Sequence, residues 1–393
     1  MLEADVEVDR RDFTVRASLT VAPGERLALF GPSGAGKTTL LEVIAGMVAP
    51  RRARIALAGR VLTSTGKSAT AVPPWQRKVG LLRQDPGLFP HLSIRDNLLY
   101  ARRGRAGRVG PAGPAGPVAG ADGAEGADGA AAGNLAELTE LSEILGIAGL
   151  LAAMPARLSG GQAHRVALGR LLLAHCDALL LDEPYAGLDA SLRRTLTDLV
   201  VSLVGQRRVP SILVAHELAE TQAFADRLAV LDRGQILQAG SPSEVVLRPA
   251  SRRVAELVGY TGFVPVPGSG SGSDRGSGPG SGSGSSPGSG PRSGRGSGPG
   301  SEETVAGVHP DRVIGGRHPD RGLVLAGVVT GCRPAGALWE VTVRVSGSRA
   351  TVVARLPEAA PSEQEIALTA LDPPCFGPDG TAVGIGETAT VPR

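Results

Sequence analysis

Short apolar runs alternate with helix-like patterns along the N-terminal part of the chain. The runs RLALF at 26–30, ALLLD at 178–182 and SILVAH at 211–216 are continuous, which is typical of strands buried on both faces of a mostly parallel sheet. Between them, TTLLEVIAGM at 38–47 has the pattern of a helix. This rhythm predicts an α/β domain over residues 1–263.

Two segments of biased composition interrupt the rhythm. Residues 104–133 are rich in Gly, Ala and Pro, which predicts a disordered surface insertion in the first domain. Residues 264–302 are almost wholly Gly, Ser and Pro, which predicts a flexible linker. Beyond it, segments such as GLVLAGVVTGC at 322–332 have a β pattern, so we expect a small all-β, barrel-like domain over 303–393.

Composition and charge exclude some classes of partner. Of the 393 residues, 42% are hydrophobic, which is enough for more than one core. The 41 basic and 38 acidic residues leave a formal charge of +3 without a basic tract, so we expect no nucleic acid partner. The three cysteines are scattered, and they predict reduced thiols of a cytosolic protein instead of a disulfide frame or a metal site.

Neither a signal peptide nor a membrane span is expected. The N-terminus is charged and lacks an apolar core. The most apolar run, at 166–181, contains Arg170, His175 and Asp177, which a membrane-spanning helix does not tolerate so close together. We therefore expect a soluble chain that reaches a membrane only through a partner.

The segment FGPSGAGKTTL at 30–40 has the spacing of a phosphate-binding loop between a strand and a helix. Its glycines allow backbone N–H groups to surround a phosphate at the N-terminus of the helix. Lys37 adds a positive charge toward the β- and γ-phosphates, and Thr38 offers a hydroxyl to Mg²⁺. The alternative is a glycine-rich turn without a ligand. The candidate nucleotide-binding residues are Gly31, Pro32, Ser33, Gly34, Ala35, Gly36, Lys37, Thr38 and Thr39.

Polar residues also follow other predicted strands. Asp182 ends ALLLD and suits a water-mediated contact to Mg²⁺, whereas the next residue, Glu183, could polarise an attacking water. His216 ends SILVAH, at the same predicted edge of the sheet. Gln84 lies in a loop and has little meaning by itself. Alone, each of these residues is better explained as a solvated or structural side chain; together with the phosphate-binding loop they predict a catalytic site.

The segment RLSGGQ at 157–162 begins another helical run with Ser159, Gly160, Gly161 and Gln162, far from the phosphate-binding loop in sequence. With GLDA, which contains Asp189, and the motifs above, it follows the order and spacing of ABC-type ATPases, which the chain resembles over 1–263. The resemblance implies an α/β P-loop NTPase fold, the ABC cassette with a helical subdomain, and an ATPase that uses ATP and Mg²⁺.

By the same resemblance, two copies of the chain form a head-to-tail dimer with ATP between them. Ser159, Gly161 and the helix that follows would then contact the γ-phosphate held by the other copy, while Asp189 would couple the two sites. Gln84 would sense Mg²⁺ and the membrane partner, and His216 would hold the γ-phosphate. The catalytic set is then Glu183, His216 and Gln84, and the metal set is Thr38, Gln84 and Asp182.

The finer resemblance concerns the transported substrate. A single cassette with a C-terminal β module resembles importer ATPases, and GRVL, LFPHLS and RDNLLY are most like the molybdate importer subunit. The tail, with GVHPDRV, is similar to the oligosaccharide/oxyanion-binding (TOBE/Mop-like) module of those importers. Implied partners are transmembrane permease subunits and, through them, an extracytoplasmic solute-binding protein, with the chain at the cytoplasmic face of the cell membrane. The alternatives are an importer ATPase for sulfate, iron or polyamine, and a soluble ABC ATPase without a transport role.

Some residues depart from the family pattern. Ala163 and His164 follow LSGGQ where polar residues are usual, and Arg83 stands where an aromatic residue usually precedes Gln84. The aromatic residue that stacks on adenine is also displaced, because the spacing from APGE falls at 9–11 and not at Phe13. Phe13 is therefore open to two interpretations, as a base-stacking residue or as part of the core.

Overall fold

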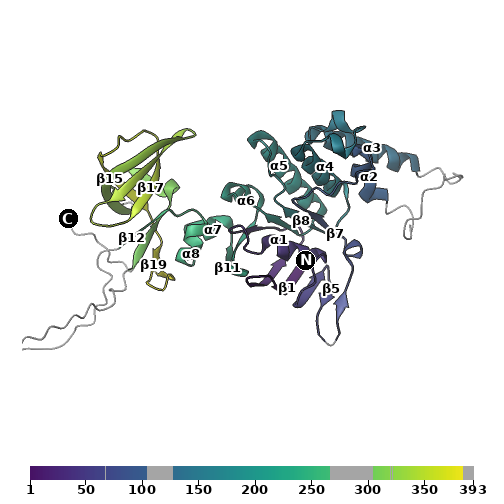
Figure 1. The fold of residues 1–393 in the computed structure, drawn as a ribbon, viewed down its shortest axis with the longest axis horizontal. Helices are drawn as coiled ribbons and strands as arrows, with labels where there is room; N and C mark the ends of the chain where they lie inside the picture. The colour runs from purple at the N-terminus through teal and green to yellow at the C-terminus, as the bar shows by residue number, and fades with distance from the viewer. Residues whose placement is uncertain (67, 104–126, 266–303, 319, 321, 384–393) are drawn as a thin grey trace, which may run out of the picture. The chain divides into compact units, whose positions relative to one another are not determined.

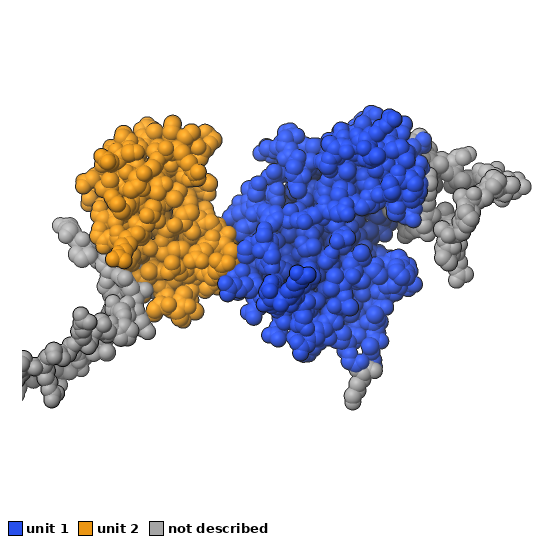
Figure 2. Space-filling model, viewed as in Figure 1, with its two compact units in different colours: residues 1–245 blue, residues 246–393 orange. Residues whose placement is uncertain are grey.

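The computed structural model describes residues 1–66, 68–103, 127–265, 304–318, 320 and 322–383. These residues form two compact units, 1–245 and 246–393, which Figure 2 shows in different colours. Residues 246–263 thus fall in the second unit, because strand β12 (Gly262–Pro265) pairs with β13 (Val305–Val308) and not with the first sheet.

The two low-complexity segments lie largely outside the described residues. Of the insertion expected at 104–133, residues 104–126 are not described, whereas 127–133 form the start of helix α3 (Ala127–Ile144). Of the linker expected at 264–302, residues 266–302 are not described, and the two residues before them end strand β12.

Unit 1 is built around an 11-stranded sheet of order β6-β5-β4-β1-β2-β11-β10-β3-β9-β8-β7. The strands are β1 (Leu2–Asp9), β2 (Thr14–Val21), β3 (Arg26–Phe30), β4 (Arg52–Leu57), β5 (Arg60–Ser64), β6 (Thr70–Ala71), β7 (Val79–Leu82), β8 (Ala178–Asp182), β9 (Ser211–Val214), β10 (Arg227–Asp232) and β11 (Gln235–Gly240). The strands β10, β3, β9, β8 and β7 are parallel, whereas β1, β2, β4, β5 and β6 form antiparallel pairs. Parallel strands end at one edge of a sheet, so the loops after them meet there.

Helices cover both faces of the parallel strands (Figure 1). Alternate residues of β8 and β9 enter two separate cores, with Leu180 and Ile212 facing α1 and Leu181 and Leu213 facing the other helices. The expectation of strands buried on both faces is therefore confirmed. The helices are α1 (Lys37–Ala45), α2 (Ile94–Arg103), α3, α4 (Gly160–Leu173), α5 (Ala190–Arg207), α6 (Leu218–Phe224) and, across the boundary of the units, α7 (Pro242–Leu247). None of the helices within the described ranges is long and apolar enough to cross a membrane.

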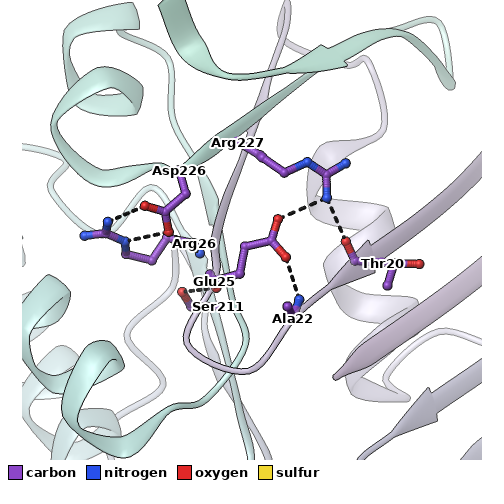
Figure 3. Close-up of polar contacts among 7 residues, drawn as sticks. All are labelled: Thr20, Ala22, Glu25, Arg26, Ser211, Asp226 and Arg227. Carbon is purple, nitrogen blue, oxygen red and sulfur yellow. Dashed lines mark hydrogen bonds and ion pairs between the residues drawn. The ribbon is translucent and has the colours of Figure 1, made fainter.

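Ion pairs fix the amino ends of the central strands (Figure 3). Arg26, the first residue of β3, donates to Asp226 from its backbone N–H and its Nε, each at 3.0 Å. Arg227, the first residue of β10, donates to Glu25 at 3.0 Å, and the backbone N–H of Ser211 donates to the Glu25 carbonyl at 3.0 Å. Hydrogen bonding to Arg26 holds the pKa of Asp226 below its usual value. These contacts align β3, β9 and β10, and so align their carboxyl ends as well.

Arg77 holds the far end of helix α1. Arg77 is 5% exposed, and its guanidinium donates to the carbonyl of Ile44 at 2.9 Å, the carbonyl of Val72 at 2.7 Å and Oγ1 of Thr63 at 2.8 Å. Gly46, in the left-handed conformation, ends the helix, and a Cβ there would lie 2.3 Å from Arg77 Nε. A cation at the C-terminus of a helix satisfies its free carbonyls and its dipole. Arg77 thus anchors the helix whose N-terminus follows the phosphate-binding loop.

Unit 2 consists of β sheets with helix α8 (Arg252–Leu257) before them. A 5-stranded sheet has the order β14-β18-β15-β16-β17, and its edge strands β14 and β17 pack against each other, which gives a barrel-like shape. A 4-stranded sheet has the order β12-β13-β19-β20. The remaining strands are β14 (Val313–Gly315), β15 (Gly322–Ala335), β16 (Leu338–Val345), β17 (Thr351–Leu356), β18 (Glu365–Leu371), β19 (Cys375–Phe376) and β20 (Ala382–Val383).

Substitution Arg77→Met is expected to lower the free energy of unfolding of the chain by about 2–3 kcal/mol, because buried carbonyls lose a charged donor. Chemical denaturation followed by circular dichroism measures this change. The control is Lys78→Met, since Lys78 is exposed and its ion pair with Asp177 spans 3.8 Å; its effect should stay below about 0.5 kcal/mol. Equal effects of the two substitutions would contradict the anchoring role.

Candidate functional site

The phosphate-binding loop joins β3 to α1, and two of its glycines are required by close contacts. A Cβ at Gly31 would lie 1.9 Å from the carbonyl oxygen of Leu231 in β10. Gly36 has φ of 105° and a Cβ there would lie 2.6 Å from Val15 in β2. Both glycines therefore allow neighbouring strands to approach the loop, while Ser33 and Gly34 stay exposed.

Lys37 is folded back into this loop. Its Nζ donates to the carbonyls of Gly31 at 2.7 Å and Pro32 at 2.9 Å, and its side chain is 5% exposed. Burial lowers the pKa of Lys37, and the carboxylates of Glu183 and Asp182 oppose that shift. The ammonium group thus lies at the N-terminus of α1, next to two acidic side chains. It is therefore already close to the loop where an anion would bind.

Asp182, the last residue of β8, is 1% exposed, and one of its oxygens, Oδ1, has no hydrogen-bond partner among the described residues. Burial raises the pKa of this carboxyl, and a hydrogen bond with Thr38 opposes the shift. A buried carboxylate oxygen without a partner, beside a hydroxyl, fits a divalent cation. No group of three or more His, Cys, Asp or Glu in the described ranges could hold a metal ion. Mg²⁺ fits this sparse set because it commonly takes one or two carboxylates and completes its shell with phosphates and waters.

Glu183 and His216 meet at the same edge of the sheet. His216 Nε2 and Glu183 Oε1 are joined by a hydrogen bond. Glu183 has a left-handed backbone, with φ of 53°, and its N–H donates to the carbonyl of Val214 in β9 at 3.1 Å. Such a conformation is uncommon for a residue other than glycine. Here it turns the chain directly after β8 and directs the Glu183 carboxylate toward the loop after β9.

Gln84 lies two residues after β7, and the segment that follows it is held by two helices. Arg170 of α4 donates to the carbonyls of Pro86 and Gly87, each at 3.1 Å. Asn97 of α2, which is fully buried, donates to the carbonyl of Phe89 at 3.1 Å and accepts from the Phe89 N–H at 2.9 Å. The sequence alone did not indicate either contact, because a single Arg or Asn within a helix has no characteristic pattern. Arg83 stands where the family usually has an aromatic residue, and its guanidinium donates to Glu42 at 3.1 Å.

One cavity of about 650 Å³ brings most of these residues together, a size that suits a nucleotide. It is lined by Asp9, Arg10, Arg11, Phe13, Ser33, Gly34, Gly36, Lys37, Thr38, Thr39, Gln84, Glu183 and His216. The turn at 9–13 therefore reaches the phosphate-binding loop, and both positions considered for base stacking, 9–11 and Phe13, face the same space. The cavity combines a cation, an anion-binding loop and an acid–base pair, a set that can bind a polyphosphate and polarise a water.

The residues of the second predicted phosphate contact lie elsewhere. Ser159, Gly160, Gly161, Gln162 and Asp189 are not among the described residues that line the cavity. Ser159 begins α4 with a capping box, in which its Oγ accepts from the Gln162 N–H at 3.3 Å and its N–H donates to Gln162 Oε1 at 2.9 Å. Among the described residues, nothing lies within 4 Å of a Cβ at Gly160. Packing against these residues therefore does not explain this glycine.

Asp189 and His164, two residues singled out from the sequence, each have contacts within their own chain. Asp189 begins α5, where its Oδ1 accepts from the N–H of Leu192 at 2.9 Å, and this hydrogen bond lowers the pKa of its carboxyl. His164 is 6% exposed in α4. Burial lowers the pKa of His164, and hydrogen bonding to the backbone of Glu183 opposes that shift. The departure at His164 thus lies against the turn that carries the predicted catalytic carboxylate.

Substitution Asp182→Asn tests the cation site. Because burial raises the pKa of Asp182, its ionised form lowers stability once the pH rises above the ordinary carboxyl range, so the variant should melt at the same or a higher temperature without nucleotide. In contrast, ATP with Mg²⁺ at a hundredfold excess over Kd should raise the free energy of unfolding of wild type by about 2.7 kcal/mol. In the variant, adding Mg²⁺ to ATP should give little further stabilisation. Thermal melting with and without Mg²⁺ measures this. The control is Asp177→Asn, at the exposed opposite end of β8; an Mg²⁺ effect retained by Asp182→Asn would refute the assignment.

The chain has relatives among proteins of known role. It is 36% identical over 248 residues to the Fe(3+) ions import ATP-binding protein FbpC of Pseudomonas fluorescens, which covers 63% of this chain and 62% of that protein. It is 38% identical over 252 residues to FbpC of Mesorhizobium japonicum, covering 64% and 62%. FbpC of Yersinia pestis is 34% identical over 246 residues, covering 63% of each chain. The matched region thus spans less than two thirds of the length of these relatives.

The fold and a family match agree with the geometry of the site. A solved structure described as the ATP binding subunit of an ABC transporter has a TM-score of 0.50 and 22% sequence identity, and the match covers 66% of this chain and 95% of that chain. Residues 15–186 match the family described as ABC transporter. Residues 15–186 therefore resemble an ABC transporter domain, and the unit that contains them has the P-loop NTPase fold of an ABC ATPase.

Proposed function

We propose that this chain is the ATP-binding and ATP-hydrolysing subunit of an ABC import complex. The observation that supports this best is the single cavity in which Lys37 and Thr38 of the phosphate-binding loop face Gln84, Glu183 and His216. A phosphate-binding loop alone would support nucleotide binding. The acid–base pair beside it supports hydrolysis as well.

The proposed mechanism assigns a task to each of these side chains. Lys37 leaves the carbonyls of its own loop and pairs with the β- and γ-phosphates of ATP. Thr38 and Asp182 would hold Mg²⁺, with Gln84 nearby, and the ion would supply positive charge to the phosphates. Glu183 accepts a hydrogen bond, and then a proton, from the attacking water. His216 donates a hydrogen bond to the γ-phosphate.

The exposed start of α4 supports a role for a second copy of the chain. Ser159 and Gly160 are exposed, the two N-terminal glycines of the helix leave its backbone accessible, and the N-terminus of a helix attracts phosphate. We infer a head-to-tail dimer in which this surface of one copy closes over the cavity of the other, with Gly161, Gln162 and Asp189 at the same interface. ATP then bridges the two copies, and hydrolysis loosens them.

The proposed partners are a membrane permease and, through it, a solute-binding protein outside the cytoplasm, which would place the chain at the cytoplasmic face of the membrane. The relatives named for Fe(3+) import favour ferric ion as the substrate. Molybdate is the second candidate, because the GRVL, LFPHLS and RDNLLY segments resemble the molybdate importer subunit. Sulfate transport, polyamine transport and a soluble switch are the remaining candidates. The metal content of the binding protein that co-purifies with the complex separates iron from molybdenum.

Substitution Glu183→Gln should abolish ATP hydrolysis but retain ATP binding, because the amide occupies the same space and no longer accepts a proton. With ATP and Mg²⁺ the variant should accumulate as a dimer, which size-exclusion chromatography with light scattering detects. The same variant with ADP serves as the control and should be a monomer. A monomer in the presence of ATP would refute the dimer mechanism.

Substitution Ser159→Arg should abolish hydrolysis while ATP still binds to the phosphate-binding loop of the same chain. A mixture with Lys37→Ala tests whether the contact crosses between copies. The mixed dimer pairs an intact loop of one variant with the intact Ser159 of the other, so the mixture should hydrolyse ATP although neither variant does alone. Ser159→Thr keeps the cap of α4 and should remain active. An inactive mixture of two well-folded variants would contradict the proposal.

A further inference from the structure

The turn between β1 and β2 brings two further cations, Arg10 and Arg11, to the cavity that contains Lys37. It is closed by a hydrogen bond from the Arg10 N–H to the carbonyl of Phe13 at 2.8 Å and by one from Thr14 Oγ1 to Asp9 Oδ1 at 2.8 Å. Arg10, Arg11 and Phe13 line the cavity together with the phosphate-binding loop. Of these, only Phe13 is aromatic, and the two arginines place positive charge beside the phosphate-binding loop.

The strand order places this turn on the opposite side of the loop from the acid–base pair. In the sheet, β2 and β10 lie on one side of β3, and β9, β8 and β7 lie on the other. Glu183 and His216 follow β8 and β9, whereas the turn at 9–13 precedes β2. A nucleotide whose γ-phosphate faces Glu183 and His216 therefore has its α-phosphate and its base on the side of the turn.

Arg10 is joined to the helix that receives the phosphates. Its Nε donates to Oγ1 of Thr39 at 2.6 Å. Thr39 is 3% exposed and lies in the first turn of α1, where backbone N–H groups have no partner within the helix. Among the described residues, no acidic side chain forms an ion pair with Arg10, so the remaining N–H groups of its guanidinium are available to an anion.

Phe13 keeps the turn in this place. Ideal Cβ atoms at Gly36 and Gly234 would lie 3.6 Å and 2.9 Å from its ring, so the ring packs directly on the backbone of both glycines. Gly234 is in turn bonded to the loop, because its N–H donates to the carbonyl of Ala35 at 2.9 Å. The turn is thus wedged against the phosphate-binding loop, and Arg10 is held beside Thr39 before any ligand arrives.

We propose that Arg10 is a nucleotide-binding residue that contacts the α-phosphate, while Thr39 fixes the orientation of its guanidinium. This inference deepens the proposed function and rests on ATP being the ligand of the cavity. ATP and ADP share the α-phosphate, so Arg10 strengthens the binding of both by the same factor. Arg11 is an adjacent exposed cation of the same cavity but has no contact with α1 in the described structure, and it makes no such contribution.

The test compares Arg10→Gln with Arg11→Gln, which change the net charge equally. Isothermal titration calorimetry of the full-length chain measures Kd for ADP and for ATP, the latter without Mg²⁺ so that hydrolysis does not proceed. Arg10→Gln should raise both Kd values about tenfold, the size expected for one charge-assisted hydrogen bond. Arg11→Gln should change them less than about twofold, through screened charge only. Melting temperatures of both variants without nucleotide check that the fold is retained.

Each other outcome has a definite meaning. Equal Kd values for the two variants would overturn the role of Arg10, and so would a loss confined to ATP, because that would place Arg10 at the terminal phosphate. If the wild-type chain binds neither nucleotide, the proposed function itself is wrong. This result is distinct from failure of the Arg10 proposal, because it is measured on the unsubstituted chain. Arg10→Lys keeps the positive charge but removes the planar guanidinium. A Kd near that of Arg10→Gln supports the proposal that Thr39 orients the guanidinium toward the phosphate. A Kd equal to that of wild type would overturn the orienting role of Thr39.

Discussion

The parallel alignment of β10, β3, β9, β8 and β7 is the constraint on which the candidate site depends. Backbone hydrogen bonds between these strands, and the ion pairs at their amino ends, make them end at one edge of the sheet. The phosphate-binding loop and Glu183 directly follow β3 and β8, and His216 lies two residues after β9. A shift of one strand by a single residue would reverse the direction of every side chain in it and would disassemble the site.

Charge at this edge is balanced within the chain. The buried ammonium of Lys37 lies near the carboxylates of Asp182 and Glu183, and burial shifts the pKa of Lys37 downward and that of Asp182 upward, toward the neutral form in each case. Buried charges without a partner are costly, so each of these groups depends on the others. A polyphosphate with its cation would replace those internal partners by stronger ones.

The loop after β7 links the cavity to the helices on one face of the sheet. Arg170 ties it to the same helix that begins with Ser159, while Asn97 ties it to α2. Hydrogen bonds to backbone carbonyls therefore connect α4 with the segment next to Gln84. In the proposed dimer, this connection would link the cavity of one copy to its own α4, the start of which would face the other copy.

The sequence by itself determined the alternation of buried strands and helices, the phosphate-binding loop, and the polar residues at the ends of β8 and β9. These features follow from local patterns: continuous apolar runs, glycine spacing and the residue that ends each run. The sequence did not determine where the second unit begins or that 127–133 are helical, because pairing of β12 with β13 and packing of α3 join distant residues.

Only the tertiary structure decided which residues share the cavity. It brought the turn at 9–13 to the phosphate-binding loop, gave Arg10 its contact with Thr39 and Phe13 its place on Gly36, and left Ser159 and Asp189 outside. The physical reason is that strand order, which sets these distances, comes from backbone pairing between segments far apart in the chain. No local pattern encodes that pairing.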